Sequence, residues 1–179
     1  MSRSIVTKLA TASLLALYLL LLSVGARAEL QIGDQAPDFA LAGSDGNEYR
    51  LADFRGKQAI VLAWFPRAFT SGCTVECKSL AENGDEIRRF DVSYFMASTD
   101  PIDKNTAFAD DTGADFPLLS DPDGSVAKAY GVYTMGFARR HTFYIDVDGN
   151  IAHIDRAVRP STSAEDMVAR LEELGVAQR

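Results

Sequence analysis

The segment 59–65 reads AIVLAWF, and the eight residues that follow it, 66–73, read PRAFTSGC. An apolar run of this length, bounded by Gly56 and Pro66, predicts a strand that is buried on both faces of a sheet. In such sheets the chemistry gathers at the carboxyl ends of the central strands, where a helix begins. We therefore expect the functional residues to lie directly after residue 65.

Short strand and helix patterns alternate along the rest of the chain. Hairpins are predicted where residues 38–42 precede 49–53 and where 141–147 precede 151–157, because turn-rich sequences separate them. The other predicted elements are strands at 92–97 and 116–119 and helices at about 73–90, 102–111, 125–130 and 161–174. Gly84 weakens the middle of the first helix. This order predicts an α/β fold with a central mixed sheet flanked by helices and an N-terminal hairpin.

Residues 1–28 differ in composition from the remainder. Arg3 and Lys8 precede a leucine-rich apolar run over residues 9–25, and residues 26–28 form an A-x-A site. This pattern predicts a cleaved secretory signal peptide. The alternative is an uncleaved anchor helix, although the run is at the short end of the roughly 20 residues that a span needs. We expect residues 29–179 to form one exported domain, periplasmic or secreted.

The composition narrows the class of protein. The chain has 179 residues, of which 47% are apolar and 24% charged, as in an ordinary globular protein. Its formal net charge of -7 argues against a nucleic-acid binder, which would carry a basic face. Its two cysteines are too few for a disulfide-dense scaffold. A domain of this size holds a core without disulfides, so we expect these cysteines to react rather than to brace the fold.

Cys73 falls at the start of the first predicted helix, where unpaired N–H groups and the helix dipole favour an anion. A cysteine in that position ionises more readily, and the thiolate is its reactive form. Thr70 can point its hydroxyl at the same sulfur or at a substrate, and Pro66 can shield the pocket. The alternative role of Cys73 is that of a small buried hydrophobe.

Cys77 follows four residues later. If both cysteines are helical, their Cβ atoms stand about 5–6 Å apart, whereas a disulfide needs roughly 3.5–4.5 Å. A bond between them would require the first helical turn to unwind, which suits a catalytic intermediate better than a structural link. The alternative is that Cys77 packs in the core and the bond never forms.

Arg139 and Arg140 precede the strand predicted from His141. Adjacent strand residues face opposite ways, so at most one of the two arginines enters the pocket, where its guanidinium would hold the thiolate. The alternative is that both lie in solvent. Neither His141 nor His153 has metal-ligand spacing, and we predict no cofactor and no metal. A solvated face is expected for the acidic residues Asp100, Asp103, Asp110 and Asp111.

Taken together, the sequence resembles the peroxiredoxins. Pro66, Thr70 and Cys73 match the family signature P-x-x-x-T-x-x-C, and Arg140 falls where the family keeps the active-site arginine of its second half. The similarity covers about residues 31–175 and includes the segments 33–39, 51–57, 117–124 and 127–132. It is strongest to the bacterioferritin comigratory protein branch of the alkyl hydroperoxide reductase/thiol-specific antioxidant family.

The resemblance implies a thioredoxin-like fold and a thiol peroxidase that reduces hydrogen peroxide and organic hydroperoxides. Cys73 would be the peroxidatic residue, with Thr70 and Arg140 aligning the O–O bond. Cys77 would resolve the sulfenic acid as a disulfide, and an external dithiol such as a thioredoxin-like protein would reset it. The expected protein is a monomer or weak dimer, and it associates stably with neither nucleic acid nor, once the signal is cleaved, membrane.

The sequence departs from the pattern of this branch in two places. The resolving cysteine usually follows the peroxidatic one by five residues, whereas here the step is four, which puts the role of Cys77 in question. Ser71 stands where proline is frequent. In addition, Glu76 adds a negative charge that would oppose the thiolate if it lies close.

Two other functions share the expected fold. A Sco-type copper-binding assembly factor has a C-x-x-x-C pair and a histidine, here His141, which would suit copper. That interpretation leaves Pro66 and Thr70 without a role. A thiol–disulfide oxidoreductase would carry C-x-x-C, and this sequence has one residue too many between its cysteines.

Overall fold

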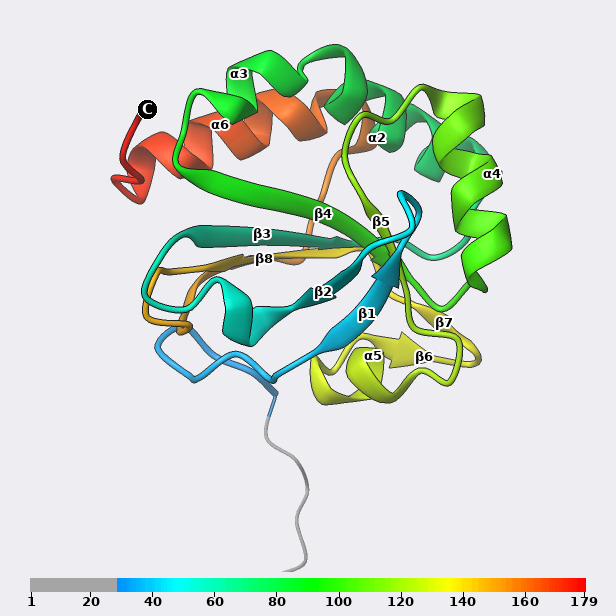
Figure 1. The fold of residues 1–179 in the computed structure, drawn as a ribbon, viewed down its shortest axis with the longest axis horizontal. Helices are drawn as coiled ribbons and strands as arrows, with labels where there is room; N and C mark the ends of the chain where they lie inside the picture. The colour runs from blue at the N-terminus through cyan, green and yellow to red at the C-terminus, as the bar shows by residue number, and fades with distance from the viewer. Residues whose placement is uncertain (1–28) are drawn as a thin grey trace, which may run out of the picture.

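A seven-stranded mixed sheet forms the centre of the computed structural model, which describes residues 29–179 (Figure 1). The signal peptide predicted for residues 1–28 lies outside the described residues. The sheet has the strand order β2-β1-β5-β4-β3-β8-β9. Its strands are β1 (Ala40–Gly43), β2 (Glu48–Arg50), β3 (Ala59–Trp64), β4 (Val92–Ser98), β5 (Leu118–Ser120), β8 (His141–Ile145) and β9 (Ile151–Asp155).

The three central strands run parallel, and the outer strands run antiparallel to their neighbours. β3 pairs with β4, and β4 with β5, in the parallel sense. β8 is antiparallel to both β3 and β9, and β1 is antiparallel to both β5 and β2. The two-residue strands β6 (Tyr133–Thr134) and β7 (Phe137–Ala138) form a separate hairpin that the sequence patterns did not predict.

β3 is buried on both faces, as its apolar run predicts. Val61 and Ala63 belong to one apolar cluster, while Ile60, Leu62 and Trp64 belong to a second on the opposite face. The alternation follows from the two-residue period of a strand. The carboxyl end of β3 therefore lies inside the protein, between two packed layers.

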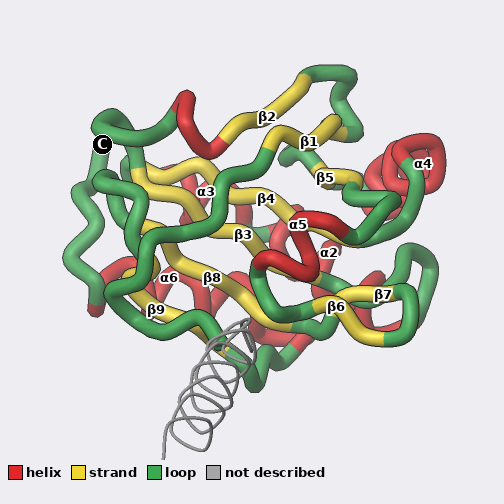
Figure 2. Tube along the Cα trace, turned by 90° about the horizontal axis from the view of Figure 1, so that it is seen from below, coloured by secondary structure: helices red, strands yellow, loops and turns green. Residues whose placement is uncertain are grey.

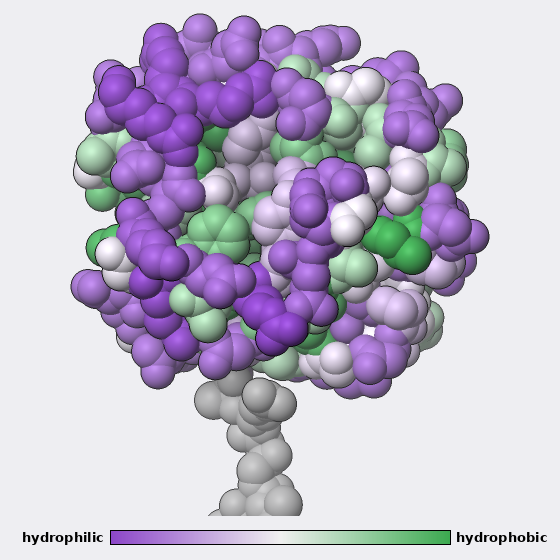
Figure 3. Space-filling view, viewed as in Figure 1, coloured by the Kyte–Doolittle hydropathy of each residue, from purple (hydrophilic) through white to green (hydrophobic). Residues whose placement is uncertain are grey.

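Four helices cover the face of the sheet on which Val61 and Ala63 lie. They are α2 (Ser71–Glu82), α3 (Gly84–Arg88), α4 (Ile102–Thr112) and α6 (Ser163–Glu173), drawn above the strands in Figure 1. α6 buries Ala164, Met167 and Leu171 against the sheet, and the outer surface above it is mainly hydrophilic (Figure 3). None of the helices among residues 29–179 has both the length and the apolar character of a membrane span.

The opposite face is covered by shorter elements. The helix α5 (Ser125–Ala129) and the N-terminal segment pack there, together with a 3-10 turn, η1 (Leu51–Asp53) (Figure 2). The second predicted strand of the first hairpin is thus shorter than expected, because its last three residues form η1 instead. A second 3-10 turn, η2 (Pro160–Thr162), precedes α6 where the sequence predicts its first turn.

The long helix predicted over residues 73–90 begins two residues earlier and is broken at Asn83, which separates α2 from α3. Gly84 is buried and is the first residue of α3, directly after the break. An added Cβ would lie 2.7 Å from Arg88 Nη1 and 2.8 Å from the Tyr94 hydroxyl. The residue that weakens the helix in the sequence thus marks the place where the chain changes direction.

Candidate active site

Cys73 lies in the first turn of α2, directly beyond the carboxyl end of β3. Thr70 has an extended backbone and is the N-cap residue, and its carbonyl accepts the first helical hydrogen bond from Thr74 N at 2.9 Å. Cys73 is therefore the third residue of the helix, where backbone N–H groups have no partner inside the helix. Both those groups and the helix dipole favour a negative charge on its sulfur.

Arg140 supplies a cation to this sulfur. β8 runs antiparallel to β3 and pairs His141 with Trp64, so the residue just before β8 arrives at the carboxyl end of β3. Arg140 Nη2 donates a hydrogen bond to Cys73 Sγ over 3.1 Å. Arg139 is exposed. One arginine of the pair enters the site and the other does not, as strand alternation predicts.

Glu76 shares the same guanidinium. Its side chain is fully buried, and Oε2 forms an ion pair with Arg140 Nη1. The other oxygen, Oε1, has no hydrogen-bond partner among the described residues. A buried carboxylate needs such a paired cation to be tolerated. The negative charge anticipated near Cys73 is present, but Arg140 binds both groups, so the guanidinium offsets the repulsion between them.

Cys77 is on the same helix but its sulfur contacts a different partner. Its Sγ lies 3.1 Å from Thr112 Oγ1 at the end of α4. The Thr112 hydroxyl donates its proton to the Phe108 carbonyl at 2.7 Å. Because a hydroxyl has only one proton, the Cys77 thiol must be the donor to Thr112. Burial raises the pKa of Cys77 to about 11, and the nearby Cys73 sulfur acts in the same direction.

Both cysteines are reduced and fully buried. The two sulfurs are held by different elements, Cys73 by Arg140 and Cys77 by α4. Cys73 has no surface open to solvent in this conformation, and no disulfide joins it to Cys77. Any reaction at this atom therefore begins with a movement of the loop or of the first turn of α2.

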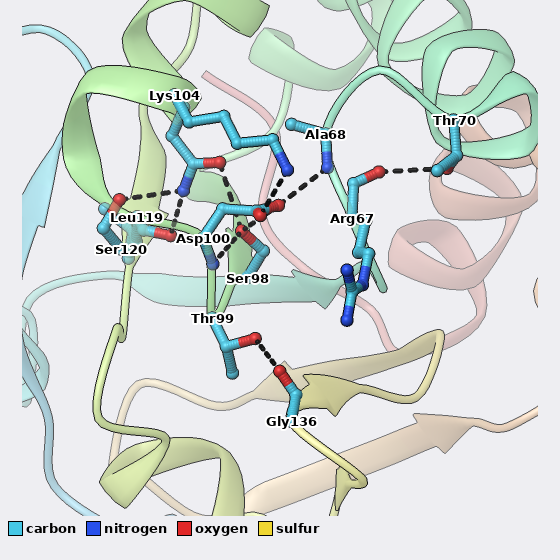
Figure 4. Close-up of polar contacts among 11 residues, drawn as sticks. Arg67, Ala68, Thr70, Ser98, Thr99, Asp100, Lys104, Leu119, Ser120 and Gly136 are labelled. Carbon is cyan, nitrogen blue, oxygen red and sulfur yellow. Dashed lines mark hydrogen bonds and ion pairs between the residues drawn. The ribbon is translucent and has the colours of Figure 1, made fainter.

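Thr70 and Pro66 flank this region without contacting the sulfur through a hydrogen bond. Thr70 is exposed, and its Oγ1 donates to the Arg67 carbonyl at 3.0 Å (Figure 4). Pro66 is half-buried where the chain leaves β3. The structure thus brings Cys73 and Arg140 together, and it places the Thr70 hydroxyl within the loop instead.

Asp100 is a residue whose role the sequence interpretation missed. It was expected on a solvated face, yet its side chain is only 11% exposed. Its Oδ2 accepts a hydrogen bond from Ala68 N at 2.7 Å, and Oδ1 pairs with Lys104 Nζ at 2.6 Å (Figure 4). Its position just after β4, the parallel neighbour of β3, was the available signal, because the ends of parallel neighbours meet. The solvated prediction is correct for the remaining three, Asp103, Asp110 and Asp111.

A buried polar network continues from Asp100 into the sheet. Ser98 Oγ donates to Asn105 Oδ1 at 3.1 Å, and Asn105 Nδ2 donates to the Leu119 carbonyl at 3.1 Å and to Ser120 Oγ at 2.8 Å. On the other side, Thr99 Oγ1 donates to the Gly136 carbonyl of the β6–β7 hairpin at 3.0 Å (Figure 4). Through these bonds the turn between β4 and α4 is tied to four segments: the loop between β3 and α2, the helix α4, the strand β5 and the β6–β7 hairpin.

The copper-binding alternative lacks its ligand set in the described part of the chain. His141 is half-buried at the start of β8, and burial lowers its pKa, as do Arg156 and Arg139. No group of three His, Cys, Asp or Glu side chains within residues 29–179 is arranged to hold a metal ion. His141 and the two cysteines do not form a common site.

Residues 32–154 match the AhpC/TSA family. The chain belongs to this family. It is 38% identical over 133 residues to the peroxiredoxin Bcp of Escherichia coli, a match that covers 70% of this chain and 85% of the relative. It is 36% identical over 126 residues to alkyl hydroperoxide reductase E of Mycobacterium bovis, covering 68% and 82% of the two chains. The crystal structure of peroxidoxin BcpB from Mycobacterium tuberculosis matches with a TM-score of 0.73 at 31% identity and covers 80% of this chain and 97% of that one.

The protein is therefore a peroxiredoxin, an oxidoreductase that reduces peroxide and is regenerated by thiol. The thioredoxin-like α/β fold and the resemblance to the bacterioferritin comigratory protein branch are confirmed. The copper-binding and disulfide-exchange alternatives are not favoured, because the matched relatives are peroxiredoxins and a hydroperoxide reductase.

Proposed function

We propose that Cys73 is the peroxidatic cysteine of this enzyme and that Cys77 resolves it. The contact between Arg140 Nη2 and Cys73 Sγ at the first turn of α2 carries this assignment. A guanidinium and a helix N-terminus both stabilise a thiolate, and they act here on the same sulfur. Cys77 has neither partner, and its raised pKa keeps it a thiol until it is needed.

In the first step the Cys73 thiolate attacks the terminal, hydrogen-bearing oxygen of the hydroperoxide. An S–O bond forms, the O–O bond breaks, and its electron pair goes to the leaving oxygen, which takes a proton to become water or an alcohol. Cys73 is left as a sulfenic acid. Arg140 stabilises the negative charge as it moves from sulfur to oxygen.

Substrate access requires movement because Cys73 has no exposed surface. The loop before α2 contains Pro66, which is half-buried, and Thr70, which is exposed. We assign Thr70 the role of holding a substrate oxygen once its hydroxyl leaves the Arg67 carbonyl. We assign Pro66 the role of covering the sulfur against bulk water, which keeps the charges around it poorly screened.

In the second step Cys77 attacks the sulfenic sulfur of Cys73. An S–S bond forms, the S–OH bond breaks, and the hydroxide leaves as water with the proton from the Cys77 thiol. The four-residue spacing demands that part of α2 unwind for the sulfurs to meet. An external dithiol then reduces the disulfide by exchange and is itself oxidised to a disulfide.

We further propose that the enzyme works outside the cytoplasm as a monomer or weak dimer. The basic, apolar and A-x-A order of residues 1–28 supports export. Because exported compartments are oxidising, the dithiol reductant would have to be another exported thiol protein. The intact mass of protein recovered from an exporting host would show whether residues 1–28 are removed.

The two cysteines are tested by intact mass after one equivalent of hydrogen peroxide. Wild type should lose two hydrogens as it forms the disulfide. Cys77→Ser should gain one oxygen and then turn over poorly with a dithiol, because a sulfenic acid without a nearby thiol waits for the external reductant.

Cys73→Ser is the complementary variant and should remain unchanged in mass while losing peroxidase activity. Full dithiol-dependent turnover in Cys77→Ser would assign the enzyme a one-cysteine mechanism. Peroxide consumption by Cys73→Ser at the wild-type rate would remove Cys73 from the mechanism altogether.

A further inference from the structure

The loop between β3 and α2 contains a strained residue. Phe69 has a φ of 65°, in the left-handed region that non-glycine residues avoid. Such a conformation is unfavourable for a residue with a side chain and persists only where the surroundings fix it. Phe69 immediately precedes Thr70, the N-cap of α2, so this backbone conformation sets the direction in which the helix and Cys73 begin.

Two contacts hold the strained residue in place. The ring of Phe69 packs edge-on against that of Phe108 on α4, with 5.2 Å between the centroids. On the other side, the backbone N–H of Ala68 donates to Asp100 Oδ2 at 2.7 Å. This hydrogen bond ties the loop to the turn that follows β4.

The Asp100 carboxylate is itself held on both oxygens. Oδ1 pairs with Lys104 Nζ at 2.6 Å, and Oδ2 lies 3.4 Å from Ser98 Oγ. The Asp100 backbone N–H donates to Ser98 Oγ at 3.1 Å. Figure 4 shows the carboxylate between α4 and the loop, with the Ala68 N–H pointing at it. Because these contacts fix the Asp100 carboxylate, it can hold the Ala68 backbone in one position.

We propose that Asp100 is a positioning residue for peroxide reduction. By accepting the Ala68 N–H it locks the loop with Phe69 in the left-handed conformation, and so places the Thr70 hydroxyl relative to Cys73 and Arg140. This inference rests on the proposed role of Cys73. Asp100 acts through the loop and touches neither the sulfur nor Arg140 by a hydrogen bond.

The geometry of the bond, not the charge of Asp100, is the source of the effect. Lys104 neutralises the carboxylate, and a negative charge near Cys73 would oppose the thiolate rather than assist it. Alignment of the O–O bond, by contrast, is sensitive to small displacements, since a shift of about 1 Å can cost roughly a hundred-fold in rate.

The test compares Asp100→Ala, Asp100→Asn and Asp100→Glu, with Asp103→Asn as the matched control, because Asp103 is an exposed carboxylate in the first turn of α4. Asn keeps an acceptor oxygen at the same distance from the backbone and removes the charge, whereas Glu keeps the charge and moves the oxygens by one methylene. Each variant is mixed with hydrogen peroxide, quenched and weighed, which gives the rate constant of Cys73 oxidation. Alkylation of Cys73 by iodoacetamide, in the Cys77→Ser background, reports thiolate reactivity without peroxide alignment.

Asp100→Ala and Asp100→Glu should slow Cys73 oxidation by about ten-fold, while their alkylation rates do not fall. Asp100→Asn should recover most of the oxidation rate, and Asp103→Asn should match wild type. If Asp100→Ala does not fold, the order of the Asn and Glu variants decides the same question.

Three results would overturn the proposal. They are a wild-type oxidation rate in Asp100→Ala, an equal fall of oxidation and alkylation, and a faster reaction in Asp100→Glu than in Asp100→Asn. Failure of the wild-type protein to oxidise at Cys73 is a different outcome, because it would contradict the proposed function itself.

Discussion

The close approach of Arg140 to Gly72 leaves little room for a side chain at position 72, in the first turn of α2. A Cβ on Gly72 would lie 3.3 Å from Arg140 Nη2, the nitrogen that donates to Cys73. Gly72→Ala should therefore push the guanidinium by a few tenths of an ångström and slow Cys73 oxidation by about three-fold, given the sensitivity of such reactions to alignment. The same change should keep or raise the melting temperature, because alanine favours helix over glycine.

Rapid-mixing oxidation kinetics and thermal unfolding of the same sample measure the two effects. Ser71→Ala is the matched control, because Ser71 is the exposed neighbour of Gly72 in the same helical turn. A Gly72→Ala enzyme that is as fast as wild type would contradict this prediction, because the Arg140 guanidinium could then shift without slowing the reaction.

Single residues were predictable from the sequence only where local geometry decides their role. The position of Cys73 follows from a helix that begins after a buried strand. Strand alternation predicts that at most one of Arg139 and Arg140 enters the site, and the resemblance to the peroxiredoxins indicates that it is Arg140. Glu76 and Asp100 are different, because their charges suggested solvent or repulsion. Their partners lie far along the chain, 64 residues away for Glu76 and 32 for Asp100. The sequence shows the charge of each residue without showing the distant group that it binds.

At the scale of elements, the contact between α2 and α4 governs how readily the second cysteine leaves its place. The Cys77 thiol donates to Thr112 Oγ1, and this bond is lost when α2 unwinds for disulfide formation. Thr112→Val removes the acceptor while keeping the shape of the side chain. Disulfide formation after one equivalent of peroxide should become about two- to five-fold faster, as expected from losing one weak hydrogen bond of the closed state.

Quenched-flow mass spectrometry separates this step from the first, which should stay at the wild-type rate. Thr112→Ser retains the hydroxyl and should restore the slower wild-type disulfide formation. Slower resolution in Thr112→Val would mean instead that Thr112 assists the attack of Cys77.

The elements themselves were predicted well where a pattern is long enough to have a period. β3 has six residues and α4 has eleven, and both were found at the expected place. The break at Asn83 and the 3-10 turn at Leu51–Asp53 are local changes of backbone conformation, which no periodicity of the sequence reports. β6 and β7 have two residues each and so carry no pattern at all.

The whole molecule brings these elements together through its strand order. The alternation of strands and helices predicts the mixed sheet, but it does not say that β3 lies between β4 and β8. That order delivers Asp100 from one neighbouring strand and Arg140 from the other to the end of β3. The site is therefore a product of topology, and its supporting residues could be located only once the order was known.

The buried ionisable groups of the core predict how the stability of the whole fold depends on pH. Burial raises the pKa of Cys77 from its ordinary 9.0 to about 11 and that of Tyr94 from 10.0 to about 12. Burial also raises the pKa of Tyr144. Because each folded-state pKa is above the unfolded value, these groups stabilise the fold fully below the unfolded pKa. Their contribution falls as pH rises through the window between the two values.

The melting temperature of the reduced protein should accordingly stay level from pH 7 to about 8.5 and fall steadily between about pH 9 and 11. Differential scanning calorimetry across this range measures the fall. Tyr144→Phe removes one buried phenol and should flatten the decline, whereas the same change at Tyr133, which is exposed, should leave it unaltered. A melting temperature that is constant to pH 11 would mean that these side chains reach water in the native state, so that folding no longer excludes their charged forms.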